Sequence, residues 1–280
     1  MNNTSHYLCP ICQYALTLQD KVYRCDNNHA FDQAKEGYVN LLPVQFKHSK
    51  DPGDNKQMVN ARRAFLESGC YQPLRDTLVK LYQQYINGGN VIDAGCGEGY
   101  YTMAHRMDNN QVYGVDIAKN AVKMAAKKYK QCHFSVASIA QLPFADGFAN
   151  WLYSIYAPIK TEEFCRLLAD DGYLVTVTPG KKHLWELKQM IYQTPKYHNI
   201  DKQQLDGFEL VAEQNLNYEM LFAHGEQALT LLAMTPFAFK SSEQLISDLQ
   251  KAKNFICQAD FMIRVYKKSV ASSESLRVRI

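Results

Sequence analysis

The stretch from residue 91 to residue 101 limits the fold of this chain more than any other. A short apolar strand ends in Asp93, a helical pattern begins near Tyr100, and alternate glycines fill the turn between them: Gly95, Gly97 and Gly99. A glycine-rich turn between a strand and a helix lets the backbone approach a nucleoside ligand closely. The next apolar run ends in Asp116, where a carboxylate can accept hydrogen bonds from ribose hydroxyls.

The acid before the glycines separates two kinds of cofactor. A dinucleotide-binding turn reads G-x-G-x-x-G, and here residue 100 is Tyr rather than a glycine. Asp93 would repel a pyrophosphate but would attract the cationic amino group of a methionine moiety. The D-x-G-x-G run therefore resembles motif I of the class I S-adenosylmethionine (SAM)-dependent methyltransferases, with Asp116 as their ribose-binding acid. The alternatives are an NAD site and a turn that only packs a helix on a sheet, but packing alone does not explain two strand-terminal acids.

Three cysteines and a histidine near the N-terminus have the spacing of a zinc site. Cys9 and Cys12 form a C-x2-C pair, and Cys25 and His29 follow as a second pair. Both thiolates of a C-x2-C turn can reach one ion, and the second pair completes a tetrahedron from the other side of a hairpin, here predicted within 14–23. Because four protein ligands fill the coordination sphere, we expect one structural Zn²⁺. The alternatives are a disulfide or four unrelated residues.

Several short motifs beyond this cluster together resemble a known family. They are Phe31–Pro43, Asp51–Asp54, Ala61–Leu66, Tyr71–Arg75, Tyr156–Pro158, Pro179–Gly180 with His183–Leu184, and Met234–Phe237. With the cysteine cluster and the D-x-G-x-G run, the chain closely resembles the bacterial 23S rRNA (guanine-N1)-methyltransferases of the RlmA family, up to about Tyr266. The resemblance implies SAM-dependent methylation of N1 of one guanine in a hairpin loop of 23S rRNA. It also implies that the zinc module helps to hold the RNA.

The pattern along the chain predicts an α/β protein: a class I (Rossmann-like) methyltransferase domain with an N-terminal zinc ribbon. We expect the ribbon in residues 1–43, a linker and a helix in 44–70, the methyltransferase domain in 71–268, and a disordered tail in 269–280. Alternating helices and strands in the third region predict a parallel sheet with helices on both faces.

The expected elements follow that alternation. The helices are 57–66, 73–86, 99–107, 118–129 and 161–168, and the strands are 90–93, 111–115, 132–136, 150–155 and 172–178. Two later runs, Phe208–Glu213 and Phe261–Tyr266, suit a terminal antiparallel pair.

The resemblance and the chemistry together suggest which residues bind SAM. Asp93 is expected at the methionine end, and Asp116 at the ribose, unless it is a solvated turn acid. The three glycines allow close approach, and Glu98 and Tyr100 flank the turn. Tyr71 and His183 are added on the family pattern alone, because a lone Tyr or His is more often packed or exposed than liganding. The catalytic residue that accepts the guanine N1 proton is not identified.

Tyr156 stands where amino-methyltransferases carry [D/N]-P-P-[F/Y], and the absence of that motif favours a ring nitrogen as the acceptor. Its ring is either packed or a face on which a flipped guanine stacks. The lysines at 119, 123 and 127 share one helical face, which we interpret as solvated rather than RNA-binding. Lys21, Arg24, Lys35 and Lys47, in or near the ribbon, are better phosphate contacts.

Composition sets the remaining expectations. The net charge is only +3, and the chain lacks a signal-peptide pattern and an apolar run long enough to span a bilayer, so a cytoplasmic protein without membrane partners is expected. Sequence leaves open whether two chains form a homodimer. It also leaves two other functions open: a small-molecule methyltransferase, and a zinc-dependent RNA-binding protein with a vestigial SAM site.

Overall fold

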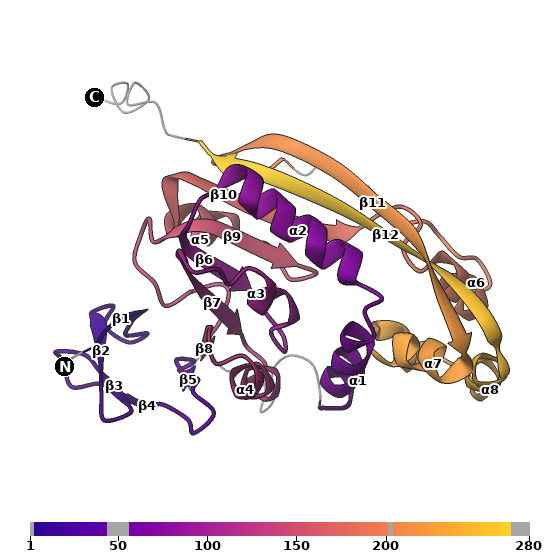
Figure 1. The fold of residues 1–280 in the computed structure, drawn as a ribbon, viewed down its shortest axis with the longest axis horizontal. Helices are drawn as coiled ribbons and strands as arrows, with labels where there is room; N and C mark the ends of the chain where they lie inside the picture. The colour runs from indigo at the N-terminus through magenta and orange to yellow at the C-terminus, as the bar shows by residue number, and fades with distance from the viewer. Residues whose placement is uncertain (1–2, 44–55, 201–203, 270–280) are drawn as a thin grey trace.

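A computed structural model describes residues 3–43, 56–200 and 204–269 (Figure 1). The expected linker at 45–54, Lys47 and all but the first residue of the expected disordered tail lie outside these ranges. The chain forms a small N-terminal sheet and a large mixed sheet with helices around it. No helix in the described ranges is long and apolar enough to cross a membrane.

The N-terminal sheet has four antiparallel strands: β1 (Asn3–Leu8), β2 (Ala15–Gln19), β3 (Val22–Arg24) and β4 (Ala30–Asp32). The expected hairpin is confirmed as β2 and β3, whose ends pair Gln19 with Val22. Asp20 and Lys21 form the turn with φ of +49° and +63°, and two left-handed residues give the twist that a two-residue hairpin needs.

The large sheet has eight strands in the order β11-β12-β10-β9-β6-β7-β8-β5. The parallel ones are β5 (Val39–Asn40), β6 (Gly89–Ala94), β7 (Asn110–Asp116), β8 (His133–Val136), β9 (Ala149–Ile155) and β10 (Leu168–Pro179). From β8 to β10 this is the doubly wound order, which confirms the predicted fold class. The strand order reverses between β6 and β9, where such sheets bind ligands.

Alternate residues of each central strand enter the cores on opposite faces of the sheet. In β6, Val91 joins the core that holds α2 (Gln72–Tyr85) and α4 (Lys119–Lys128). Its neighbour Ile92 joins the core that holds α5 (Thr161–Leu167) and the ribbon residues Tyr7 and Leu16. The ribbon therefore occupies a face of the sheet that a helix would otherwise cover.

The ribbon also joins the sheet at its edge. Strand β5 pairs with β8, and Val39 and Leu41 are buried in the same core as Ile92. Leu8 N donates to Pro143 O at 2.9 Å, while the Tyr7 ring packs against Tyr113 and Phe144. The segment expected to be a separate module is thus continuous with the main sheet from residue 39 onward.

One predicted helix is shorter than expected. The pattern suggested 99–107, but α3 covers only Tyr100–Ala104. Asn110 explains its end, because the side-chain amide donates to His105 O at 2.6 Å while its oxygen accepts from Met107 N at 2.9 Å. The predicted helix 57–66 is confirmed as α1 (Lys56–Glu67).

The terminal antiparallel pair is confirmed but is much longer than predicted. Strands β11 (Phe208–His224) and β12 (Lys253–Lys268) pair along almost their whole length, and β12 also pairs with β10. They extend beyond the other strands, and α7 (Gly225–Ala233), the 3₁₀ helix η2 (Pro236–Lys240) and α8 (Glu243–Lys251) connect their far ends (Figure 1). Most of β11 is exposed, and the apolar run that predicted it covers only its first six residues.

Candidate functional site

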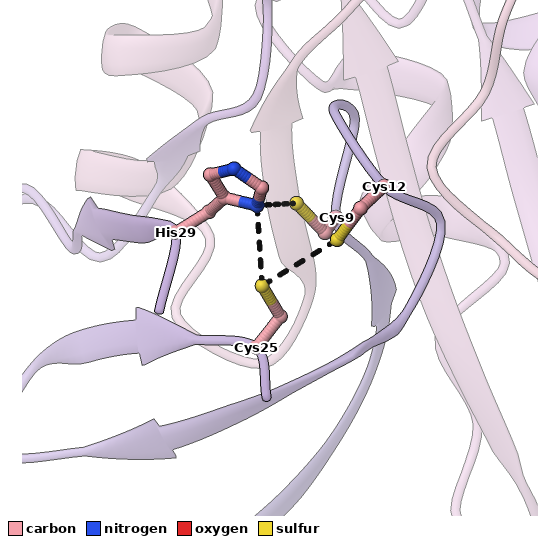
Figure 2. A group of neighbouring side chains, drawn as sticks. All are labelled: Cys9, Cys12, Cys25 and His29. Carbon is pink, nitrogen blue, oxygen red and sulfur yellow. Dashed lines mark hydrogen bonds between the residues drawn. The ribbon is translucent and has the colours of Figure 1, made fainter. Parts of the chain in front are cut away.

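The four expected zinc ligands converge between the hairpins of the ribbon (Figure 2). Cys9 and Cys12 lie on the turn between β1 and β2, and Cys25 and His29 on the turn between β3 and β4. Their ligand atoms all lie within 4.8 Å of one another. All eight cysteines of the chain are free, which excludes the disulfide alternative.

The spacing of these atoms fits a zinc ion. A tetrahedral ion with ordinary Zn–S and Zn–N bond lengths separates two sulfurs by about 3.8 Å, and sulfur from nitrogen by about 3.6 Å. The Cys12 and Cys25 sulfurs are 3.6 Å apart, while His29 Nδ1 is 3.5 Å from Cys9 Sγ and 3.4 Å from Cys25 Sγ. With all four positions filled by protein, the zinc is structural.

A second group of predicted residues lies at the carboxyl ends of β6 and β9, where the strand order reverses. Asp93 is the penultimate residue of β6, and its glycine turn leads into α3. Tyr156 follows β9, with a strained φ of +54° and its N–H bonded to Val177 O at 3.1 Å. The two turns touch, because a Cβ added to Gly95 would lie 2.5 Å from Ala157 Cβ.

Two buried acids give this edge an unusual charge. Asp93 is 2% exposed and accepts from Thr102 Oγ1 at 2.6 Å, and burial raises its pKa to about 7. Glu98 is 7% exposed, and burial also raises its pKa to about 7, although its own backbone N–H and Arg62 favour the charged form. Such acids favour a cationic ligand, and SAM carries both an ammonium and a sulfonium group.

Asp116 lies at the end of β7 and closes the glycine turn. Its carboxylate accepts from Gly97 N at 2.9 Å and from Ala118 N at 2.7 Å. With Gly97 and Glu98 it lines a cavity of about 30 Å³, bounded on the other side by Val59 and Arg62 of α1. That cavity holds about one water, so α1 covers the predicted nucleoside site.

The three glycines have different surroundings. A Cβ at Gly95 would collide with Ala157, and one at Gly99 would lie 3.0 Å from Ala125 and Tyr129. A Cβ at Gly97 would meet no atom within 4 Å, although its φ of +54° is in the left-handed region. Gly95 and Gly99 therefore allow packing between elements, and Gly97 alone leaves space beside the turn.

Tyr71 and His183, which are far apart in the sequence, meet at the same edge. His183 Nε2 lies 3.3 Å from the Tyr71 hydroxyl and 3.2 Å from that of Tyr156. Tyr71 and His183 are buried, whereas Tyr156 keeps 45% of its surface exposed. The hydroxyl of Tyr156 is thus anchored while part of its ring stays accessible.

The neighbouring strand fixes the proton on His183. Asp260 N donates to Nδ1 at 3.2 Å, so the hydrogen of the neutral ring is on Nε2, facing the two tyrosines. Burial lowers the pKa of His183 to about 3, and nearby His198 acts in the same direction. The imidazole is therefore a neutral hydrogen-bond donor toward the site.

Asp260 and Thr102 were not predicted. The Asp260 carboxylate accepts from Lys182 N and from the Asn215 side chain, each at 2.7 Å, and so fixes the loop that carries His183. The only sequence feature that pointed to Asp260 was its position as an acid directly before the predicted strand Phe261–Tyr266. Thr102 lies nine residues after Asp93, on the first turn of α3, and no sequence motif marked it as a partner of that acid.

The remaining predicted residues are Tyr100, the lysines of α4 and the basic residues of the ribbon. Tyr100 is buried beneath the Arg75 guanidinium, which lies 5.1 Å from the ring centre. On the lysine face of α4, Lys123 pairs with Glu36 of the ribbon at 3.5 Å. This contact supports a structural use of that face. Lys21, Arg24 and Lys35 are exposed on the ribbon.

Comparisons with known proteins agree with both parts of the chain. The model of the RlmA N-terminal zinc ribbon matches residues 7–50, and a methyltransferase-domain model matches residues 87–225. The 23S rRNA (guanine(748)-N(1))-methyltransferase of Streptomyces fradiae is 33% identical over 233 residues, covering 79% of this chain and 82% of the relative. A Bacillus subtilis (strain 168) protein, provisionally named a 23S rRNA (guanine-N(1))-methyltransferase, is 28% identical over 94% of this chain and 98% of its own length.

A more distant match covers only part of the chain. The malonyl-[acyl-carrier protein] O-methyltransferase of Hamiltonella defensa is 30% identical over 119 residues, which is 40% of this chain and 46% of the relative.

The fold and the two sites together define the class of this protein. The order of the strands in the large sheet, the acid–glycine turn and the Cys₃His cluster are those of a class I SAM-dependent methyltransferase that carries a structural zinc ribbon. Within that class, the chain belongs to the RlmA family of 23S rRNA (guanine-N1)-methyltransferases.

Proposed function

We propose that this protein transfers the methyl group of SAM to N1 of one guanine in a hairpin loop of 23S rRNA, in the cytoplasm. The observation that carries the proposal is the zinc ribbon built onto the sheet of a methyltransferase whose relatives are named for this reaction. A small-molecule enzyme of the same fold has no evident use for such a ribbon. We also propose that the ribbon contacts the RNA backbone, with Lys21, Arg24 and Lys35 exposed for that purpose.

The residues at the carboxyl edge suggest how the cofactor is held. Asp93 and Glu98 would attract the positively charged methionine end, and Gly97 would give the cofactor room beside the turn. Asp116 would accept from the ribose once α1 moves aside, because the cavity beside it is too small for a nucleoside. The hydroxyl of Tyr71 would donate a hydrogen bond to the cofactor, and His183, whose Nε2–H faces the hydroxyls of Tyr71 and Tyr156, would hold that hydroxyl in place.

The exposed ring of Tyr156 would receive the flipped guanine. The backbone at Tyr156 is strained, and His183 holds the hydroxyl, so the ring is fixed before substrate arrives. SAM, when bound, supplies an electrophilic methyl group. The chain contributes alignment of guanine N1 with that group and exclusion of water, which together supply much of the rate of a direct displacement.

The test uses purified protein, 23S rRNA and SAM with a labelled methyl group. After nuclease digestion, mass spectrometry identifies the labelled nucleoside and its position. We expect one N1-methylguanosine in a hairpin loop, with one label for each rRNA molecule. Label on another atom or another base would refute the proposal. If SAM fails to bind in calorimetry, the vestigial-site alternative is correct instead. Sedimentation of the same sample distinguishes a monomer from a homodimer.

A further inference from the structure

A basic and aromatic surface adjoins the Tyr156–His183 pair. It consists of Lys181, Lys182, Trp185, Lys196 and Tyr197, which we call the 181–197 surface. Its first two lysines directly precede His183, and its last member directly precedes His198, whose ring centre is 6.3 Å from that of His183. Trp185 begins α6 (Trp185–Ile191), which packs against β12 (Figure 1).

The two aromatic rings of this surface form a fixed platform. The ring centres of Trp185 and Tyr197 are 4.2 Å apart with 31° between their planes, and Lys181 Nζ lies 5.4 Å from the centre of the Tyr197 ring. His198 N donates to Lys181 O at 3.1 Å, which ties the two segments together. Tyr197 nevertheless keeps 46% of its surface exposed. A large ring held in place yet half exposed suits stacking by a planar ligand.

The charge of this surface is positive, and the nearby Asp260 carboxylate is buried and accepts from the backbone N–H of Lys182 rather than from a lysine side chain. Lys181, Lys182 and Lys196 are exposed, and none pairs with a carboxylate in the described ranges. The one acid between residues 180 and 200 is Glu186, and its carboxylate already accepts from Gln258 N at 2.8 Å. By contrast, Lys123 and Lys128 of α4 are paired with acids of the ribbon and of α1. The 181–197 surface therefore has cations available for an anionic partner.

We propose that the 181–197 surface binds the unpaired RNA segment that adjoins the target guanine. The lysines would contact its phosphates, and one of its bases would stack on Tyr197. Unpaired RNA offers both phosphates and free base faces, whereas a duplex keeps its bases stacked on one another. The inference rests on the proposed function, since the surface leads directly to Tyr156, where the target base would lie.

The test measures RNA binding through Trp185. The chain has two tryptophans, and Trp151 is fully buried in the sheet, so RNA contact at this surface should quench Trp185 fluorescence. The probes are a 23S rRNA hairpin that carries the target loop and a blunt duplex of the same length. We expect quenching by the hairpin and little quenching by the duplex.

Variants assign that binding to the named residues. In the K181E/K182E double variant we expect at least tenfold weaker hairpin binding and a smaller salt dependence, by roughly 0.7 in log–log slope for each lost contact. In Y197A we expect roughly five- to hundredfold weaker binding. The matched control is K267E, because the register of β12 places Lys267 at the opposite end of the sheet. Thermal melting of each variant verifies its fold.

Two results would separate this inference from the proposed function. If the wild-type protein methylates guanine N1 while the 181–197 variants bind the hairpin as tightly as K267E, the inference is wrong and the function stands. If RNA binding falls in the variants but the wild type methylates no guanine, the surface is real and the function is wrong. The inference predicts a raised KM for RNA in the variants, with kcat retained at saturating RNA.

Discussion

The zinc cluster and the carboxyl edge of the large sheet are assembled in opposite ways. The four zinc ligands lie within 21 consecutive residues, and two short hairpins bring them together. At the sheet edge, Tyr71 and His183 are 112 positions apart, and they meet only when α2, β9, β10 and β12 have taken their places. The cluster is therefore assembled by a local segment of the chain, whereas the edge depends on the whole fold.

The largest effect is expected from loss of the metal. Cys25→Ala removes one of four ligands, and structural zinc contributes on the order of 10 kcal/mol to the folding of such modules. We expect the ribbon to lose its zinc and its structure, and methylation of rRNA to be abolished. SAM binding should persist, because the residues predicted to bind SAM all lie outside the ribbon. Metal analysis, calorimetry and the rRNA assay measure the three outcomes.

Cys165→Ala is the matched control, since that cysteine lies outside the cluster and is half-buried. It should retain zinc and activity. If Cys25→Ala also lost SAM binding, the ribbon and the sheet edge would form one cooperative unit. That result would contradict the separate assembly of the zinc cluster and the edge.

The next largest effect is expected at Asp93. Asp93→Asn removes the buried negative charge, and we expect SAM to bind roughly ten- to hundredfold more weakly, since hydrogen bonds to charged groups contribute about 1.5–3 kcal/mol. Zinc content should not change. Asp170→Asn, whose carboxylate is 83% exposed at the far end of β10, is the control for loss of one negative charge.

The same variant tests the direction of the pH dependence. The folded pKa of Asp93 is raised from 3.8 to about 7, so the acid is protonated in the unliganded fold at pH 5 and charged at pH 8. Its contribution to stability is therefore present below about pH 4 and is lost as pH rises through 7. SAM affinity should change the opposite way and increase between pH 6 and pH 8. Asp93→Asn should flatten that increase, and an equally steep profile in the variant would contradict the assignment.

A moderate effect is expected at Tyr156. Tyr156→Ala removes the ring and should reduce rRNA methylation by roughly five- to hundredfold, the range for loss of one base–aromatic stack. Tyr156→Phe keeps the ring and loses only the bond to His183, which contributes about 1 kcal/mol. The phenylalanine variant should therefore retain most of the activity. If both variants were equally impaired, the hydroxyl and not the ring would be the important group.

The smallest effect is expected where α1 covers the site. Glu67 pairs with Lys128 of α4 at 2.6 Å and with Arg63 at 3.0 Å, and these pairs are exposed. Glu67→Gln should cost under about 1 kcal/mol of stability. Since we propose that α1 moves aside to admit SAM, looser pairing should speed SAM association by a few-fold in stopped-flow measurements. Slower association would mean that α1 helps to form the site rather than covering it.

The same difference explains how much could be predicted from sequence. The Cys₃His cluster and the acid–glycine turn are local patterns, and their residues lie where the spacing placed them. The core strands were predicted because a short apolar run is a local signal. By contrast, the exposed length of β11 and the role of Asp260 depend on partners far along the chain. The different surroundings of Gly95, Gly97 and Gly99 likewise follow from neighbours that no spacing reveals.

The most direct test of the central claim maps N1-methylguanine across the 23S rRNA of cells with and without the gene. We expect one guanine in a hairpin loop to lose its methyl group in the deletion strain. We also expect the wild-type gene to restore the methyl group and the Cys25→Ala gene to fail to do so. A deletion strain whose 23S rRNA keeps every N1-methylguanine would show that this protein does not methylate guanine N1 of 23S rRNA.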